Sequence, residues 1–140
     1  MANPLSRFNL TPTVNVAPVR YIDYVSSITP VGDFKKIENI NVIMNSWNNI
    51  LLTPRGTYDH DPEYGSGLYE LLYQPVDVET LGSIRDEIYN SLYYYDNRAT
   101  IENIDIKFAK SPGKGFIVNI LVDYEGEKSE LTIKIKDTAQ

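Results

Sequence analysis

The sequence lacks cysteine, has a single histidine and contains no long apolar run. A disulfide framework, a thiolate nucleophile and a cysteine-based metal site are therefore not expected, and the redox compartment stays open. A membrane helix needs about 18 consecutive apolar residues, and the N-terminus shows no basic stretch followed by an apolar one. We therefore expect a protein that is neither exported by a signal peptide nor embedded in a membrane.

The charge balance is acidic, with 13 Lys and Arg against 19 Asp and Glu and a net charge of −6. Such a surface repels phosphate backbones and anionic lipids unless a local patch overrides it. We therefore expect neither nucleic acid nor a membrane as a partner. A chain of 140 residues fits a single domain that buries roughly two thirds of its unfolded surface in one core.

Tyrosine is abundant, with 11 copies. Its large ring and polar hydroxyl suit a surface that becomes buried against a partner yet stays soluble alone. A tyrosine-rich core of an α+β protein would need the same residues, and both interpretations can hold together.

The first 30 residues show no sustained period and are predicted to form an extended N-terminal arm, with the domain at 31–140. Prolines at positions 4, 12, 18 and 30 block a helix, and valines and isoleucines favour extended chain. The arm carries Phe8, Tyr21 and Tyr24, which it cannot bury on itself. We expect it to lie along a partner or along its own domain, and a leader without fixed structure is the alternative.

Three helices are expected in the first part of the domain, after a short strand over Asp33 to Ile37. The first follows one apolar stripe, the second is a short amphipathic run closed by Pro75, and the third begins at a capping Asp77 and ends near Asp96, where Asn97 suits a left-handed cap. The stripes comprise Ile40, Ile43, Met44, Trp47, Ile50 and Leu51; Leu68, Leu71 and Leu72; and Leu81, Ile84, Ile88, Leu92 and Tyr95, widened by Tyr89 and Tyr93.

From Thr100 onward the apolar period changes to two, which predicts three antiparallel strands joined by turns near Gly113 and Gly126. The second strand, Phe116 to Tyr124, is predicted to be the most buried. Three strands leave at least one open edge, which is either defended or used. The lysines of the last strand could be the defence. The candidate edge residues are Ile104, Ile106, Leu131, Thr132, Ile133, Lys134, Ile135 and Lys136.

The stretch from Leu51 to Asp77, LLTPRGTYDHDPEYGSGLYELLYQPVD, has a more specific residue order than any other part of the chain. Its order of LLT, PRG, DPEYGSGL and LLYQPVD resembles the signature of the small baseplate wedge subunit of contractile-tailed phages and type VI secretion systems. Members of that family often carry a lysozyme-like label. The resemblance covers roughly residues 32–136. Where the family has Glu-Pro-Arg, this chain has Asp96, Asn97 and Arg98, so that an ion pair is possible but the fixed φ of proline is lost.

The resemblance implies an α+β domain similar to the inner domain of a tail sheath protein, in a baseplate assembled in the host cytoplasm with suspected six-fold symmetry. It implies that Asp96 and Arg98 face other wedge proteins and that the sheet receives strands from the first sheath ring. The open edge of the sheet fits such strand addition along 131–136 or 100–108. Arg55 and Arg98 could each contact a neighbour or serve as an internal brace. A phage tail is favoured over a secretion or tailocin apparatus.

An enzyme is the alternative. Lysozyme-type hydrolysis of peptidoglycan needs two carboxylates about 5–9.5 Å apart, one with a raised pKa. The candidates Asp59, Asp61, Glu63 and Glu70 lie in or beside a turn, where acidic residues usually cap helices or accept from backbone amides. His60 has no second histidine to complete a metal site, and no phosphate-binding glycine loop is present. We therefore expect no catalytic residue, metal or cofactor.

Overall fold

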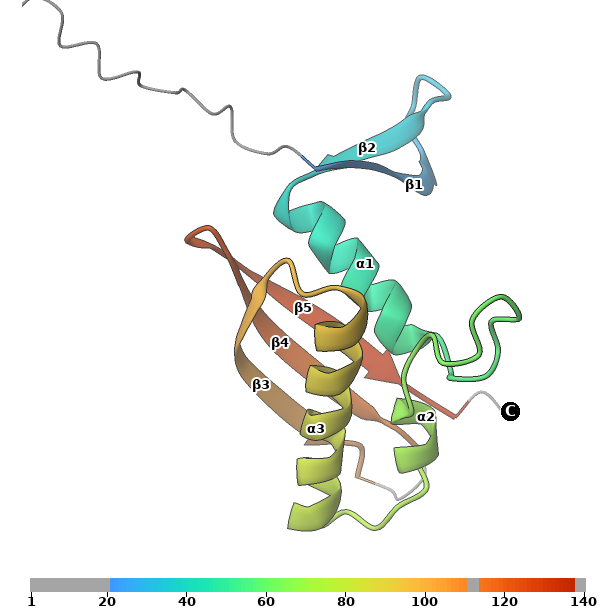
Figure 1. Cartoon of the computed structure of the whole chain (residues 1–140), viewed down its shortest axis with the longest axis vertical. Coiled ribbons are helices and arrows are strands. Elements are labelled where there is room, and N and C mark those ends of the chain that lie inside the picture. The colour runs from blue at the N-terminus through green and yellow to red at the C-terminus, as the bar shows by residue number, and fades with distance from the viewer. Residues whose placement is uncertain (1–20, 111–113, 138–140) are drawn as a thin grey trace, which may run out of the picture.

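The computed structural model describes residues 21–110 and 114–137, and it places an α+β fold in them (Figure 1). Three antiparallel strands form a sheet in the order β3-β4-β5, with β3 at Thr100–Phe108, β4 at Phe116–Tyr124 and β5 at Glu127–Ile135. The predicted meander is confirmed. In the central strand β4, every second side chain is buried, from Phe116 to Tyr124. One face of the sheet is therefore covered.

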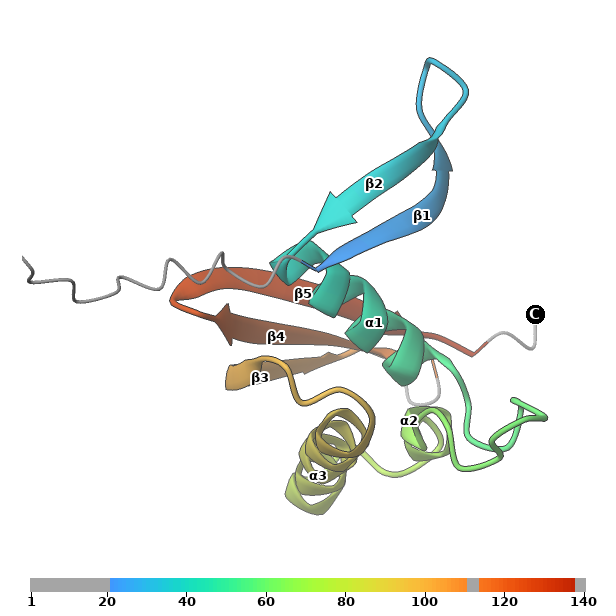
Figure 2. The same ribbon diagram turned by 45° about the horizontal axis from the view of Figure 1, so that its top comes forward.

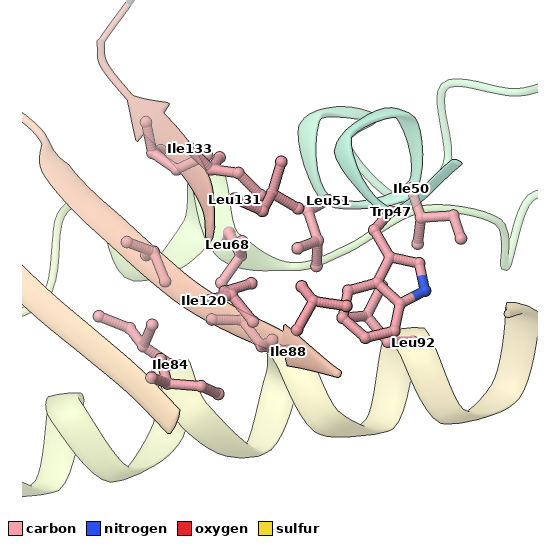
Figure 3. Packing of buried hydrophobic residues seen from close by; sticks show 14 of the residues in the cluster. Trp47, Ile50, Leu51, Leu68, Ile84, Ile88, Leu92, Ile120, Leu131 and Ile133 are labelled. Carbon is pink, nitrogen blue, oxygen red and sulfur yellow. The ribbon is translucent and has the colours of Figure 1, made fainter. Parts of the chain in front are cut away.

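The three helices cover that face, as Figures 1 and 2 show from two directions. They are α1 (Ile40–Leu52), α2 (Leu68–Leu71) and α3 (Val78–Tyr95). Their apolar stripes meet the buried side chains of β4 and β5 in one hydrophobic cluster, seen in Figure 3 around Trp47, Leu68, Ile88 and Ile120. The predicted single core is confirmed, and it fixes the orientation of α1 and α3 on the sheet.

A second, two-stranded sheet stands apart from this body at the start of α1 (Figure 2). It pairs β1 (Ile22–Ile28) antiparallel with β2 (Phe34–Glu38), so the short strand predicted at 33–37 is present within one residue of its bounds. The predicted N-terminal arm thus ends in a paired strand. Its first 20 residues, with Phe8, lie outside the described residues, and the domain boundary at residue 30 stays a prediction.

The predicted cap of α3 is confirmed, because the Asp77 carboxylate accepts a hydrogen bond from the backbone N–H of Thr80. Two predictions about this helix were wrong. Asn97 is not left-handed: among the described residues only Asn39 and Glu125 have positive φ outside glycine. The helix ends at Tyr95, and its C-cap residue Asp96 has a φ of −154° and a ψ of 89°. Tyr89 and Tyr93 do not widen the buried stripe but are exposed. The core is already filled by Ile84, Ile88 and Leu92.

Candidate functional site

The loop at 53–67, which joins α1 to α2, is held in a defined conformation by hydrogen bonds. Its two ends are paired by hydrogen bonds from Arg55 N to Ser66 O, at 3.1 Å, and from Ser66 N to Thr53 O, at 2.9 Å. The buried Ser66 hydroxyl also donates to the carbonyl of Leu51 at the end of α1, at 2.7 Å. The chain therefore leaves and re-enters the helical layer at fixed points, as expected for a stretch whose residue order is specific.

Gly65 is required by this geometry. It has a φ of +107°, and a Cβ at this position would overlap the carbonyl oxygen of Thr53. Residues with a side chain rarely adopt such backbone angles. In addition, the atom that the Cβ would meet belongs to the main chain of Thr53 and cannot move aside as a flexible side chain could. The tight approach of the two ends of the loop thus depends on one glycine.

Glu87 on α3 holds the loop from the other side. Its Oε1 accepts hydrogen bonds from Arg55 Nη2 at 2.6 Å and from the backbone N of Gly67 at 2.7 Å. The hydroxyl of Ser91 donates to the same oxygen at 3.2 Å. Arg55 is thus engaged within the chain. The sequence interpretation missed Glu87, since nothing in the spacing of an exposed helix face marks a carboxylate that meets a loop 20 to 32 residues away.

Asp96 and Arg98 form the ion pair that the altered triplet left possible. The carboxylate of Asp96 accepts from Arg98 Nε at 2.7 Å and from Arg98 Nη2 at 2.6 Å, a two-point contact. The Asp96 side chain is only 4% exposed, whereas that of Arg98 is 30% exposed. The pair therefore sits at the edge of the core, with its acid inside.

Three parts of the fold meet at this pair. The backbone carbonyl of Asp96 accepts from the indole Nε1 of the buried Trp47 in α1 at 3.0 Å. The guanidinium of Arg98 lies 5.0 Å from the ring centroid of Tyr21, which in turn packs edge-on against Tyr124 at the end of β4. The pair thus connects α1, the end of α3 and the residue that leads into β1.

Opposing effects set the pKa of Asp96. Burial is the largest of them and raises the pKa, but hydrogen bonds from Arg98 and Ser46 and the positive charge of Arg98 outweigh it. The pKa of Asp96 therefore lies below its ordinary value of 3.8. The same contact raises the pKa of Arg98. Asp96 is ionised in the folded protein at neutral pH.

The sheet offers its two outer strands, β3 and β5, as open edges, because neither pairs with a further strand among residues 21–110 and 114–137. On β5 the side chains of Leu131, Ile133 and Ile135 are buried, and Thr132, Lys134 and Lys136 are exposed. On β3 Ile104 is buried and Ile106 is half-buried. The apolar residues among the predicted edge residues thus pack into the core, whereas the polar ones are exposed. The backbone of each outer strand remains unpaired on its outer side within the described residues.

None of the four catalytic candidates is buried. Asp59, Glu63 and Glu70 are exposed, and one Asp61 oxygen accepts from the backbone N of Glu63 in a local turn, at 3.1 Å. His60 is exposed and stacks edge-on with Tyr58. Within the described part of the chain there is no group of three or more acidic or histidine side chains that could hold a metal ion. No helix there is long and apolar enough to cross a membrane.

Residues 38–136 match the family model described as baseplate wedge protein gp25. No curated protein matches the chain.

Several solved structures share the fold, and they include the following three. A protein from Geobacter sulfurreducens, provisionally assigned as a tail lysozyme, has a TM-score of 0.61 and 19% identity over 69% of this chain and 88% of its own. A chain of the six-fold symmetrised baseplate of the anti-feeding prophage has a TM-score of 0.64 and 18% identity, over 77% of this chain and 87% of its own. A chain of the postcontracted pyocin R2 baseplate has a TM-score of 0.54 and 18% identity, over 84% of this chain and 99% of its own.

Proposed function

Because this chain belongs to the baseplate wedge protein gp25 family, we propose that it is a structural baseplate component that joins the wedge to the first ring of a tail sheath. Its place is the baseplate of a phage tail or of a related tailocin-type particle. The observation that supports the proposed contact with the sheath is the three-stranded sheet, whose two outer strands are unpaired on one side within the described residues. We take other baseplate proteins and the sheath subunit as the partners, in a six-fold symmetric baseplate that is assembled in the host cytoplasm.

Strand addition would give the sheath a template. An added strand gains main-chain hydrogen bonds along the edge, and the alternation of side chains fixes its register. In this proposal the sheet is similar to the inner domain of a sheath subunit, so that the first sheath ring meets the baseplate as it would meet another sheath ring. Asp96 and Arg98, which lie between α3 and β3, would support the contact with the wedge.

Cysteine cross-linking tests the strand addition, and the cysteine-free chain makes single substitutions clean. Thr132 on β5 and Asp105 on β3 are both exposed and pair with the same residue of β4, Asn119. Neighbouring strands lie about 4.8 Å apart, which a disulfide can span. We expect Thr132→Cys or Asp105→Cys to cross-link to every second position of a cysteine scan through a terminal segment of the sheath subunit.

The matched control is Ser83→Cys, at an exposed position on α3. Cross-links at neither edge, or cross-links from Ser83→Cys with equal yield, would contradict strand addition. A cryo-EM reconstruction of the sheath-baseplate junction provides the independent measurement, in which one of the two outer strands must be paired.

Hydrolysis of peptidoglycan is the competing function, suggested by the lysozyme assignment of one structural neighbour. We propose that this chain is not an enzyme, because none of its candidate carboxylates is buried: Asp59, Glu63 and Glu70 are exposed, and the half-buried Asp61 accepts from a backbone amide in a local turn. Purified protein is expected to release no muropeptides above a buffer control. Turnover that is lost in Glu63→Gln would establish the enzyme instead.

A further inference from the structure

A cavity of about 380 Å³ opens between the 53–67 loop and the C-terminal half of α3. It is lined by Arg55, Glu63, Asn90, Ser91, Tyr94 and Tyr95. Neither Asp96 nor Arg98, and no residue of the three-stranded sheet, is among the residues that line it. Neither the core nor the proposed strand addition uses it.

The rings of Tyr94 and Tyr95 line this cavity, and two further tyrosines of the loop extend the aromatic cluster without lining it. Tyr94 and Tyr95 stand edge to face with centroids 4.8 Å apart, and Tyr95 meets Tyr64 of the loop at 5.1 Å. Tyr58 continues the series at 5.5 Å from Tyr64. Tyr94 is 78% exposed, although it lines a cavity in a cluster of rings. Ring faces of this kind attract cations.

A polar group in this cluster has no partner. The hydroxyl oxygen of Tyr95 is buried, and nothing in residues 21–110 and 114–137 forms a hydrogen bond with it. A buried hydroxyl without a partner costs free energy that a ligand could recover. A group with hydrogen-bond donors that entered the cavity would supply that partner once the neighbouring side chains shifted to uncover the hydroxyl oxygen.

The charge of the cavity is negative. Arg55 is neutralised by its 2.6 Å contact with Glu87, while no ion pair within the described residues engages Glu63 or Asp61. Burial, the largest effect, raises the pKa of Tyr95, and the charges of Asp61 and Glu63 raise it further against the opposing effect of Arg55. The electrostatic potential at the hydroxyl therefore favours a cation.

We propose that this cavity receives an arginine side chain from a neighbouring baseplate protein. A guanidinium stacks on aromatic rings and presents several N–H donors in a plane, so that it can contact Glu63 and the Tyr95 hydroxyl together. The identity of the donor as a baseplate protein rests on the proposed function. The chemistry of the cavity does not, because it follows from the rings, the unpaired hydroxyl and the excess of carboxylates.

Titration of the full chain with the peptide acetyl-Gly-Arg-Gly-amide, followed by NMR, tests the binding chemistry. The same peptide with citrulline is the neutral control. We expect arginine-specific shifts at Glu63, Tyr94 and Tyr95, and affinity reduced roughly three- to tenfold in Glu63→Gln and in Tyr94→Ala. Shifts that citrulline reproduces, or the absence of shifts at these residues, would overturn the proposal.

Tyr93→Ala is the matched control for Tyr94→Ala. Both tyrosines are 78% exposed on the same helix, but only Tyr94 lines the cavity. Tyr93→Ala is expected to bind the arginine peptide like the wild type. Equal losses in the two variants would mean that the helix surface acts generally and that the cavity is not the site.

Incorporation into baseplates separates this inference from the proposed function. We expect Tyr94→Ala and Glu63→Gln to reduce incorporation and Tyr93→Ala to leave it unchanged. If the wild-type chain is not incorporated at all, the proposed function fails, and the peptide titration still decides on the cavity. If all variants are incorporated like the wild type, the cavity is not a docking site, and the proposed function stands.

Discussion

Replacing Gly65 with alanine is expected to destabilise the protein by about 3 kcal/mol or more, which is a large loss for a single methyl group. Part of the loss comes from a backbone angle that alanine adopts poorly, and the rest from overlap of the new Cβ with the carbonyl oxygen of Thr53. To relieve the overlap, the two ends of the 53–67 loop must separate. This breaks the hydrogen bonds between Ser66 and Thr53 and between Arg55 and Ser66.

Gly56 provides the matched control, because it also has a positive φ, +86°, but has open space where a Cβ would be. Gly56→Ala is expected to cost only about 1 to 2 kcal/mol, the conformational part alone. Urea unfolding of both variants gives the two free energies of unfolding. Equal losses would show that the approach of Gly65 to Thr53 does not hold the loop.

The regular elements of this fold follow from local pattern. The stripe from Ile40 to Leu51 has the period of a helix, and the strands after Thr100 have the period of a sheet. In both cases the buried residues of the structure are mostly those that the period selects. The Asp77 cap is equally local, since the accepting carboxylate and the donating N–H are three residues apart. Such features depend on near neighbours, and sequence alone can therefore predict them.

Contacts between distant residues were not predictable in the same way. Arg55 was singled out, but Glu87, which binds it, was not, because an exposed helical glutamate has no distinguishing pattern before the loop is placed against it. Asn97 suited a left-handed cap by residue type, yet Asp96 and Arg98 on either side of it are held by their ion pair. This ion pair and the hydrogen bond from the distant Trp47 to the Asp96 carbonyl overrode the preference of a single residue type there.

Arg98→Ala is expected to destabilise the isolated protein by about 3 kcal/mol at neutral pH, because it leaves the buried carboxylate of Asp96 without its charged partner. Adding Asp96→Asn should recover part of the loss. Lys107→Ala is the control, since it removes an exposed pair with Asp105, also two residues apart, and should change the free energy of unfolding little. If Arg98→Ala blocks baseplate assembly but leaves unfolding unchanged, Arg98 is an interface residue and not a brace.

The free energy of unfolding of the wild type and that of Arg98→Ala should also depend differently on pH. In the wild type the pKa of Asp96 is lowered from its ordinary 3.8, so its contribution to stability is complete above about pH 5 and is lost as the pH falls through the folded pKa. In Arg98→Ala, burial acts with less opposition, and the pKa of Asp96 should rise. Protonation then relieves the buried charge. The stability difference between the two proteins should therefore narrow as the pH falls from 6 to 3, and a constant difference in urea unfolding across that range would contradict the brace.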